Sequence, residues 1–118
     1  MRKAYGIDGG KKMKLGIIIN TNDPESAWNA LRLGSSAIAV GNEVSVFLLG
    51  SGVEIENIKD KTFDVSGALS NFLDSGGKLL ACGTCLKVRH QAASVCPIST
   101  MAQLVEMISD SDKVVTLG

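Results

Sequence analysis

Two of the three cysteines and the only histidine of this chain lie close together, at Cys82, Cys85 and His90. Thiols and imidazoles are the side chains that proteins use for nucleophilic chemistry at sulfur, for disulfide exchange and for binding zinc. The apolar run before Cys82 predicts a buried strand, and the residues after Gly83 predict the first turn of a helix. Open α/β sheets place their ligands at the carboxyl ends of strands, so we expect the functional site here.

Cys82 is the candidate for the reactive thiol. We expect it to end the strand and to be exposed by the turn at Gly83. The thiolate is the nucleophile, whereas a free thiol with a pKa of ~8.5 is mostly protonated at neutral pH. The N–H groups after Thr84, together with Lys87 and Arg89, favour the thiolate. The alternative interpretation is that Cys82 is a small apolar residue packed at the end of a strand.

Cys85 has three interpretations. It could close a disulfide with Cys82 and release whatever Cys82 carries, share a metal with Cys82, or be a small buried residue that faces the sheet. A Cys-x-x-Cys pair also occurs in thioredoxin-type oxidoreductases, where it follows an early strand and is flanked by Trp and Pro. Here the motif follows the third predicted strand, its central residues are Gly83 and Thr84, and the only tryptophan is Trp28.

A zinc site is the competing arrangement. The spacing Cys82-x2-Cys85-x4-His90-x5-Cys96 comes within one residue of a zinc knuckle, and three thiolates with one imidazole complete a tetrahedral site. Zinc knuckles are small polar modules that fold around their metal, whereas Cys82 ends an apolar strand in a chain with ample core. Without zinc, His90 is a cation near a helix end or a surface residue, and Cys96, next to Pro97, packs in the core.

The rest of the chain alternates strands and helices. Short apolar runs rich in β-branched residues predict strands at 15–20, 44–49, 78–82, 94–98 and 113–117. Apolar residues at helical spacing predict helices that begin near Pro24, Asp64 or Ser66, Thr84 and Thr100. This alternation predicts an α/β fold, a three-layer α/β/α sandwich with a parallel sheet of about five strands. We expect the charged segment 53–63 to be a loop or irregular helix that could cover a site.

Length and composition limit the class of protein. With 118 residues, of which 45% are hydrophobic and 20% charged, the sequence predicts one globular domain. Twelve basic residues balance twelve acidic ones, which argues against nucleic acid or an anionic membrane as a partner. The apolar runs are too short to span a bilayer.

An odd number of cysteines without a secretory signal predicts a reduced, cytoplasmic protein. Residues 1–13 are basic and lack an apolar core segment. We expect them to be a flexible leader, with Met13 as the natural start and residues 14–118 as the single domain.

Three segments carry a resemblance to a known family: LACGTCLK at 80–87, CPISTM at 96–101 and SDKVVT at 111–116. They resemble the DsrE/DsrF-like family, which includes subunits of bacterial sulfur-relay complexes and the small YchN-like proteins. The general pattern of residues 14–117 also fits this family. The resemblance implies a sandwiched α/β domain with five strands, flavodoxin-like in general architecture, that assembles into trimers or hexamers.

In the sulfur-relay members of this family, a cysteine at the end of the third strand carries sulfur as a persulfide between partner proteins. That cysteine corresponds to Cys82, and the second cysteine of the YchN-like subset corresponds to Cys85. Arg89 matches the arginine of an Arg-Gly pair. His90 stands at the glycine position, and histidine adopts a positive φ less readily than glycine.

The resemblance therefore implies a sulfur carrier in a sulfur-relay or sulfur-oxidation pathway, with a protein donor, a protein acceptor and no cofactor. Cys82 would accept sulfane sulfur, Lys87 and Arg89 would stabilise the anionic persulfide, and Cys85 would resolve or protect it. The alternative function is a non-catalytic oligomeric binding domain, in which the cysteines and His90 hold a structural metal or sense redox state.

Overall fold

A computed structural model describes residues 12–89 and 98–118, in which five parallel strands form one sheet. The strands lie in the order β4-β3-β2-β1-β5. Their bounds are Lys14–Ile19 for β1, Glu43–Leu48 for β2, Lys78–Cys82 for β3, Ile98–Ser99 for β4 and Lys113–Leu117 for β5. The helices are α1 (Pro24–Ala39), the 3₁₀ helix η2 (Gly50–Asn57), α2 (Val65–Asp74), α3 (Gly83–Val88) and α4 (Met101–Asp110).

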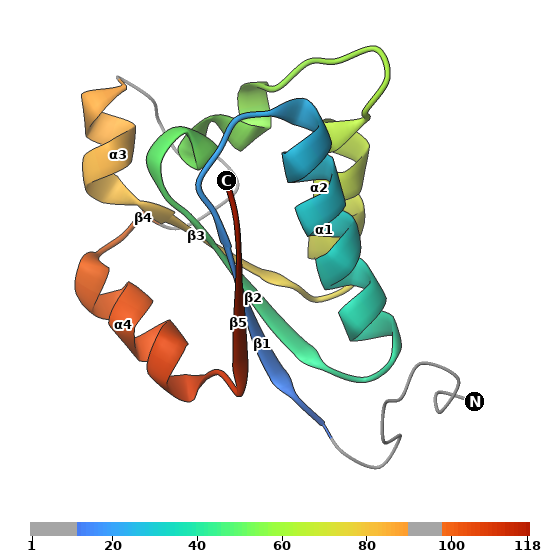
Figure 1. Cartoon of the computed structure of the whole chain (residues 1–118), viewed down its shortest axis with the longest axis vertical. Helices are drawn as coiled ribbons and strands as arrows, with labels where there is room; N and C mark the ends of the chain where they lie inside the picture. Colours follow the sequence, from blue (N-terminus) through green and yellow to red (C-terminus); the bar gives the residue numbers. More distant parts are fainter. Residues whose placement is uncertain (1–11, 90–97) are drawn as a thin grey trace.

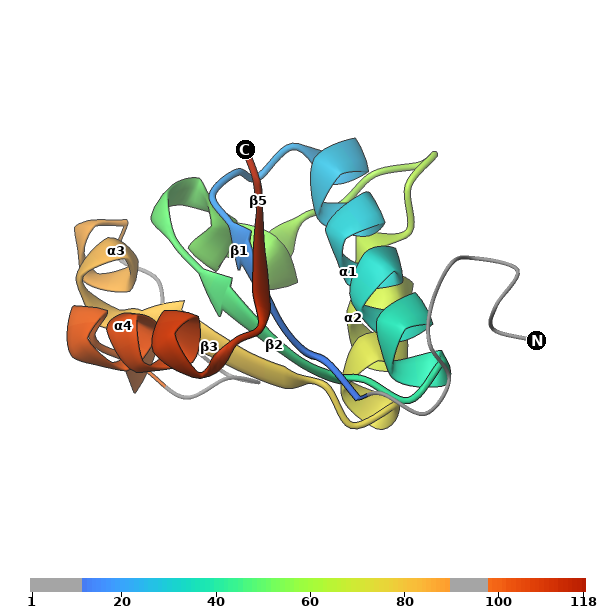
Figure 2. The same ribbon diagram turned by 60° about the horizontal axis from the view of Figure 1, so that its bottom comes forward.

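The helices cover both faces of the sheet. In Figures 1 and 2, α1 and α2 lie on one face, while α4 and the short α3 lie on the other. The chain steps from β1 through β4 in one direction and then returns across the sheet, by way of α4, to place β5 beside β1. The prediction of a three-layer α/β/α sandwich with a parallel sheet is confirmed.

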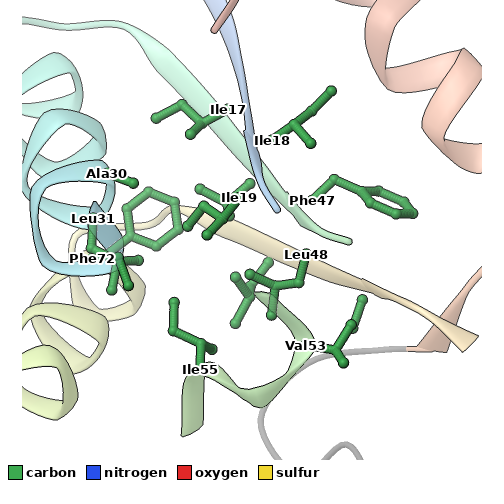
Figure 3. Close-up of a cluster of buried hydrophobic side chains, with 14 of the residues drawn as sticks. Ile17, Ile18, Ile19, Ala30, Leu31, Phe47, Leu48, Val53, Ile55 and Phe72 are labelled. Carbon is green, nitrogen blue, oxygen red and sulfur yellow. The ribbon is translucent and has the colours of Figure 1, made fainter. Parts of the chain in front are cut away.

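β1 is an interior strand of the sheet and is buried on both faces, as its continuous β-branched run predicts. Figure 3 shows Ile17 and Ile19 on the side of α1, where Phe72 of α2 also lies. Ile18 points to the opposite face together with Phe47 of β2, its partner in the parallel ladder. Because successive side chains alternate across a sheet, one uninterrupted apolar strand contributes to the core of both layers.

Local capping signals set the beginnings of the longer helices. The carboxylate of Asp23 accepts a hydrogen bond from the N–H of Ser26, and Pro24 occupies the first turn of α1. Asp64, one of the two predicted caps, begins α2. Thr100 and Gln103 form the predicted capping box of α4, in which each side chain bonds to the other residue's main-chain N–H.

The two packed helices α1 and α2 approach closely at a glycine. A side chain at Gly34 would have its Cβ 2.8 Å from Cε1 of Phe72, whose ring is fully buried. The small residues Ala27 and Ala30 lie on the same buried face of α1. The close packing of these helices against the sheet depends on this series of small side chains.

The structure adds detail to two of the expected segments. The segment 53–63 divides into the end of η2 and an irregular stretch, in which Asp60 accepts hydrogen bonds from the N–H groups of Thr62 and Phe63. The fourth strand is described only as Ile98–Ser99, and residues 94–97 lie outside the described part of the chain. This strand lies at one edge of the sheet, next to β3.

The amino-terminal side of the domain is anchored at Met13. Its N–H donates to Oδ1 of the buried Asn42, and its carbonyl accepts from the N–H of Glu43. Residues 1–11 lie outside the described part, so the leader stays a prediction. Across the described residues, no helix combines the length and apolar character required to cross a bilayer.

Candidate functional site

Cys82 is the last residue of β3 and at the same time the N-cap of α3. Its sulfur accepts a hydrogen bond from the N–H of Cys85 at 3.4 Å, so one of the expected helix N–H groups does reach it. The side chain is only 3% exposed. The expectation that the turn at Gly83 exposes Cys82 is therefore wrong. The chain passes directly into α3, and β4 pairs alongside with Ser99 opposite Cys82, so both elements enclose this strand end.

Cys85 is the more accessible of the two thiols, being half-buried in the first turn of α3. Its sulfur accepts a hydrogen bond from the main-chain N–H of Gly50 at 3.3 Å. Burial raises the pKa of the Cys85 thiol above its ordinary value, and a hydrogen bond with Cys82 raises it further. The Gly50 N–H and the positive charge of Arg89 act in the opposite direction, because both stabilise the thiolate.

Gly50 can hold this N–H in place because of the turn that follows β2. Its φ is +56°, and a side chain there would collide with Oδ1 of Asn20, the residue that follows β1. The N–H of Asn20 in turn donates to the carbonyl of Leu117 in β5. The ends of β1, β2, β3 and β5 therefore meet at one edge of the sheet, where a main-chain donor is directed at Cys85.

Arg89 lies one helical turn after Cys85 and forms an ion pair with Glu54 of η2. The Nε of Arg89 is 3.2 Å from the Glu54 carboxylate, and both side chains are 31% exposed. Nη1 of Arg89 donates to the carbonyl of Cys85 at 3.4 Å, and Glu54 also accepts from the Asn22 amide at 3.2 Å. The guanidinium predicted to support the site is thus present, and the carboxylate of Glu54 partly neutralises its positive charge.

Lys87 stands apart from this arrangement. It is exposed and follows Cys85 by two positions, which on a helix directs the two side chains to different faces. Arg89, at four positions, is on the same face as Cys85. The helical spacing therefore separates the two cations that the sequence grouped together.

Gly50 and Glu54 are the site residues that sequence reasoning missed. The sequence predicts that segment 53–63 could cover a site, and η2, which contains Glu54, does pack against α3 at the end of β3. The Gly50-Ser51-Gly52 run directly after a strand could have indicated these residues. Parallel strands end at the same edge of a sheet, so a turn after one strand can lie near a cysteine that ends another. Which strands are neighbours, however, follows only from the tertiary structure.

The zinc arrangement cannot be assembled from the residues the structure describes. His90 and Cys96, its third and fourth ligands, lie outside them. Within residues 12–89 and 98–118, no group of three or more His, Cys, Asp or Glu side chains is placed to hold a metal ion. Cys82 and Cys85 are free thiols that lie next to each other. The zinc site stays an alternative prediction.

Solved structures with the same fold include two proteins of unknown function. A conserved protein of unknown function from Bacteroides thetaiotaomicron superposes with a TM-score of 0.72 at 19% identity, over 87% of this chain and 93% of that one. A protein of unknown function from Methanobacterium thermoautotrophicum superposes with a TM-score of 0.68 at 13% identity. The superposition covers 87% of this chain and 98% of that one. Likeness at these identities concerns the fold alone.

Sequence relatives are found in two archaea. An uncharacterized protein of Methanocaldococcus jannaschii is 32% identical over 114 residues, which is 88% of this chain and 99% of that protein. One from Methanopyrus kandleri is 30% identical over 98 residues, or 77% and 81% of the two chains. The sequence profile of the DsrE/DsrF-like family matches residues 13–117. Because this match spans nearly the whole chain, the protein belongs to the DsrE/DsrF-like family.

Proposed function

We propose that this protein is a sulfur carrier that holds sulfane sulfur as a persulfide at the Cys82–Cys85 pair and passes it to an acceptor thiol. The observation that carries the proposal is the arrangement of the pair itself. Two free thiols adjoin at the end of a strand, and the accessible one receives a main-chain N–H from Gly50 and lies near a guanidinium. Membership of the DsrE/DsrF-like family supports the same chemistry.

The transfer is nucleophilic exchange at sulfur. A cysteine thiolate of the pair attacks the outer sulfur of a donor persulfide, and the donor leaves as a thiolate. In the second half, an acceptor thiolate attacks the outer sulfur now held by the carrier and releases the carrier cysteine. Each half forms one S–S bond and breaks one, so no oxidant or reductant is needed. The rate depends on the thiolate fraction and on access.

The residues around Cys85 suit a sulfur atom that alternates between thiolate and persulfide. Both forms are anionic when deprotonated, and a main-chain N–H with a nearby guanidinium stabilises an anion without adding a competing nucleophile. The donor N–H of Gly50 is fixed by the turn after β2, so it needs no rearrangement when the charge appears. We place the carrier in the cytoplasm, since a reducing compartment keeps the thiols free.

We further propose that donor and acceptor are proteins and that the carrier is a homo-oligomer, as the family resemblance implies. The support for assembly is an exposed apolar stripe on α4 that lies beside its buried residues Leu104 and Met107. Met101, Val105 and Ile108 follow one another at helical spacing and are 55%, 64% and 44% exposed. Exposed apolar stripes of this kind are typical of surfaces that another protein covers.

The test is the uptake of one sulfur atom. Reduced protein is incubated with a low-molecular-weight persulfide, and intact-mass spectrometry measures the added sulfur. We expect one sulfur per chain in the wild type, which is then transferred when an acceptor thiol is added. The double variant Cys82→Ser/Cys85→Ser retains the third cysteine, Cys96, and is the matched control. If that variant gains sulfur as readily as the wild type, the pair is not the carrier site.

A further inference from the structure

We infer that the two cysteines have an order: Cys85 receives the sulfur, and the buried Cys82 resolves the Cys85 persulfide by forming a Cys82–Cys85 disulfide that releases hydrosulfide. This inference rests on the proposed carrier function and extends it. It assigns to the pair a second activity, the discharge of sulfur that no acceptor has collected. It also reverses the roles that the sequence assigned to the two residues.

Access is the first observation behind this order. Cys82 is 3% exposed, whereas Cys85 is half-buried and bordered by the turn at Gly50. A persulfide on a donor protein is bulky and must bring its outer sulfur into contact with the attacking thiolate. In the described structure, only Cys85 offers a sulfur that such a donor can reach. Burial raises the pKa of the Cys85 thiol, and the Gly50 N–H and the charge of Arg89, which stabilise a negative charge on this sulfur, act against that rise.

Proximity is the second observation. The Cys82 sulfur accepts the Cys85 N–H at 3.4 Å and shares a hydrogen bond with the Cys85 thiol, so the two sulfur atoms are neighbours. A thiolate next to a persulfide can attack its inner sulfur without a second protein. The buried Cys82 is therefore placed to act on a sulfur that Cys85 has received.

The step balances without another reagent. The Cys82 thiolate forms an S–S bond with the Cys85 sulfur, while the bond from that sulfur to the transferred sulfur breaks. The transferred sulfur leaves with the bonding electron pair as hydrosulfide, so it is reduced by two electrons. The two cysteine thiols are oxidised to a disulfide in the same step. A dithiol reductant in the cell returns the pair to its free form.

The result is a carrier that releases its sulfur as hydrosulfide when no acceptor thiol arrives in time. An acceptor thiol that arrives early takes the outer sulfur and leaves both cysteines reduced. If no acceptor arrives, attack by Cys82 removes the sulfur and leaves a disulfide that cannot be loaded again until it is reduced. The pair would thereby limit how long a reactive persulfide stays on the protein.

The experiment is a pulse of a low-molecular-weight persulfide, followed by its removal and by intact-mass and released-sulfide measurements over time. In the wild type we expect a persulfide on Cys85 that decays to one hydrosulfide per chain and a Cys82–Cys85 disulfide, mapped by peptide mass spectrometry. In Cys82→Ser the persulfide forms at the wild-type rate but lasts at least about tenfold longer, because the intramolecular thiol is absent. In Cys85→Ser loading is slow, since Cys82 is buried.

Cys82→Ala is the second variant, because it keeps the buried site apolar if the serine hydroxyl disturbs folding. The carrier function and the order of the cysteines fail in different ways. If the wild type takes up no sulfur, the carrier function itself is wrong. If the wild type is loaded but Cys85→Ser is loaded equally fast, Cys82 is the acceptor and our order is wrong. A persulfide that decays as fast in both Cys82 variants as in the wild type also overturns it.

Discussion

The main-chain N–H of Gly50 donates a hydrogen bond to the sulfur of Cys85 across 3.3 Å, and so joins the turn after β2 to the helix after β3. Gly50 adopts a φ of +56° in this turn. The side chain of Asn20 occupies the space in which a Cβ at position 50 would lie. A thiol near the surface thus depends on a glycine thirty-five positions earlier in the chain.

The substitution Gly50→Ala tests this contact. We expect a loss of about 1–2 kcal/mol in the free energy of unfolding, because alanine is strained at positive φ. We also expect slower alkylation of Cys85 at neutral pH, because a displaced N–H no longer stabilises the thiolate. Gly41→Ala is the matched control, since Gly41 has a φ of +97° with open space around it. Equal alkylation rates in the two variants would show that the contact does not influence Cys85.

The positive charge of Arg89 should lower the pKa of the Cys85 thiol, whereas that of Lys87 should not. We therefore expect Arg89→Gln to move the pH profile of Cys85 alkylation to higher pH. Lys87→Gln removes the same charge from the same helix, but on another face, and should leave the profile in place. The measurement is the alkylation rate of Cys85 against pH, followed by peptide mass spectrometry. A larger shift in Lys87→Gln than in Arg89→Gln would contradict the geometry.

Stability should depend on pH through Cys85. Burial raises the pKa of this thiol, with a further contribution from Cys82, so the folded chain holds the thiol proton more tightly than the unfolded chain does. This contribution to stability is complete below the unfolded thiol pKa of ~8.5 and is lost as the pH rises through the folded pKa. We expect the free energy of unfolding of the wild type to fall relative to Cys85→Ser above that pH. Urea unfolding at a series of pH values measures the difference, and a constant difference would count against the raised pKa.

Packing between α1 and α2 should not tolerate a methyl group at Gly34. The Cβ would lie 2.8 Å from Cε1 of the fully buried Phe72. Alanine favours a helix by about 1 kcal/mol over glycine, but overpacking costs about 1–3 kcal/mol, so we expect Gly34→Ala to be destabilising. Ser36→Ala, an exposed change on the same helix, is the control. Combining Gly34→Ala with Phe72→Leu should recover part of the loss, and a stabilised Gly34→Ala single variant would refute the close contact.

The exposed apolar stripe on α4, formed by Met101, Val105 and Ile108, should be the surface through which copies of the chain associate. Light scattering on the wild type should give a mass well above that of one 12.4 kDa chain. The double variant Val105→Gln/Ile108→Gln should lower this mass, because burying an amide without a partner costs free energy. Glu106→Gln changes an exposed residue between them and should have no effect. A wild-type protein that is monomeric at all concentrations would rule out this role for α4.

Much of the fold follows from local patterns. The apolar run at 15–20 predicts a strand covered on both faces, and Pro24, the pair Asp64 or Ser66, and Thr100 predict the starts of three helices. These features depend on residues close together in the chain, and their physical basis is side-chain periodicity and the unpaired N–H groups of a first helical turn. The position of Cys82 at the end of the third strand was predicted correctly for the same reason.

Local sequence patterns were enough to predict the fold class, the strand that ends in Cys82 and a second thiol three residues later. The burial of Cys82, the accessibility of Cys85, the hydrogen bond from Gly50 to Cys85 and the ion pair of Glu54 with Arg89 became known only from the folded structure. The reason is that exposure and distant contacts depend on which strands lie side by side. The pairing of β4 with β3 encloses Cys82, and the placement of β2 next to β3 brings Gly50 and Glu54 to the site. No spacing along the chain encodes that order of strands.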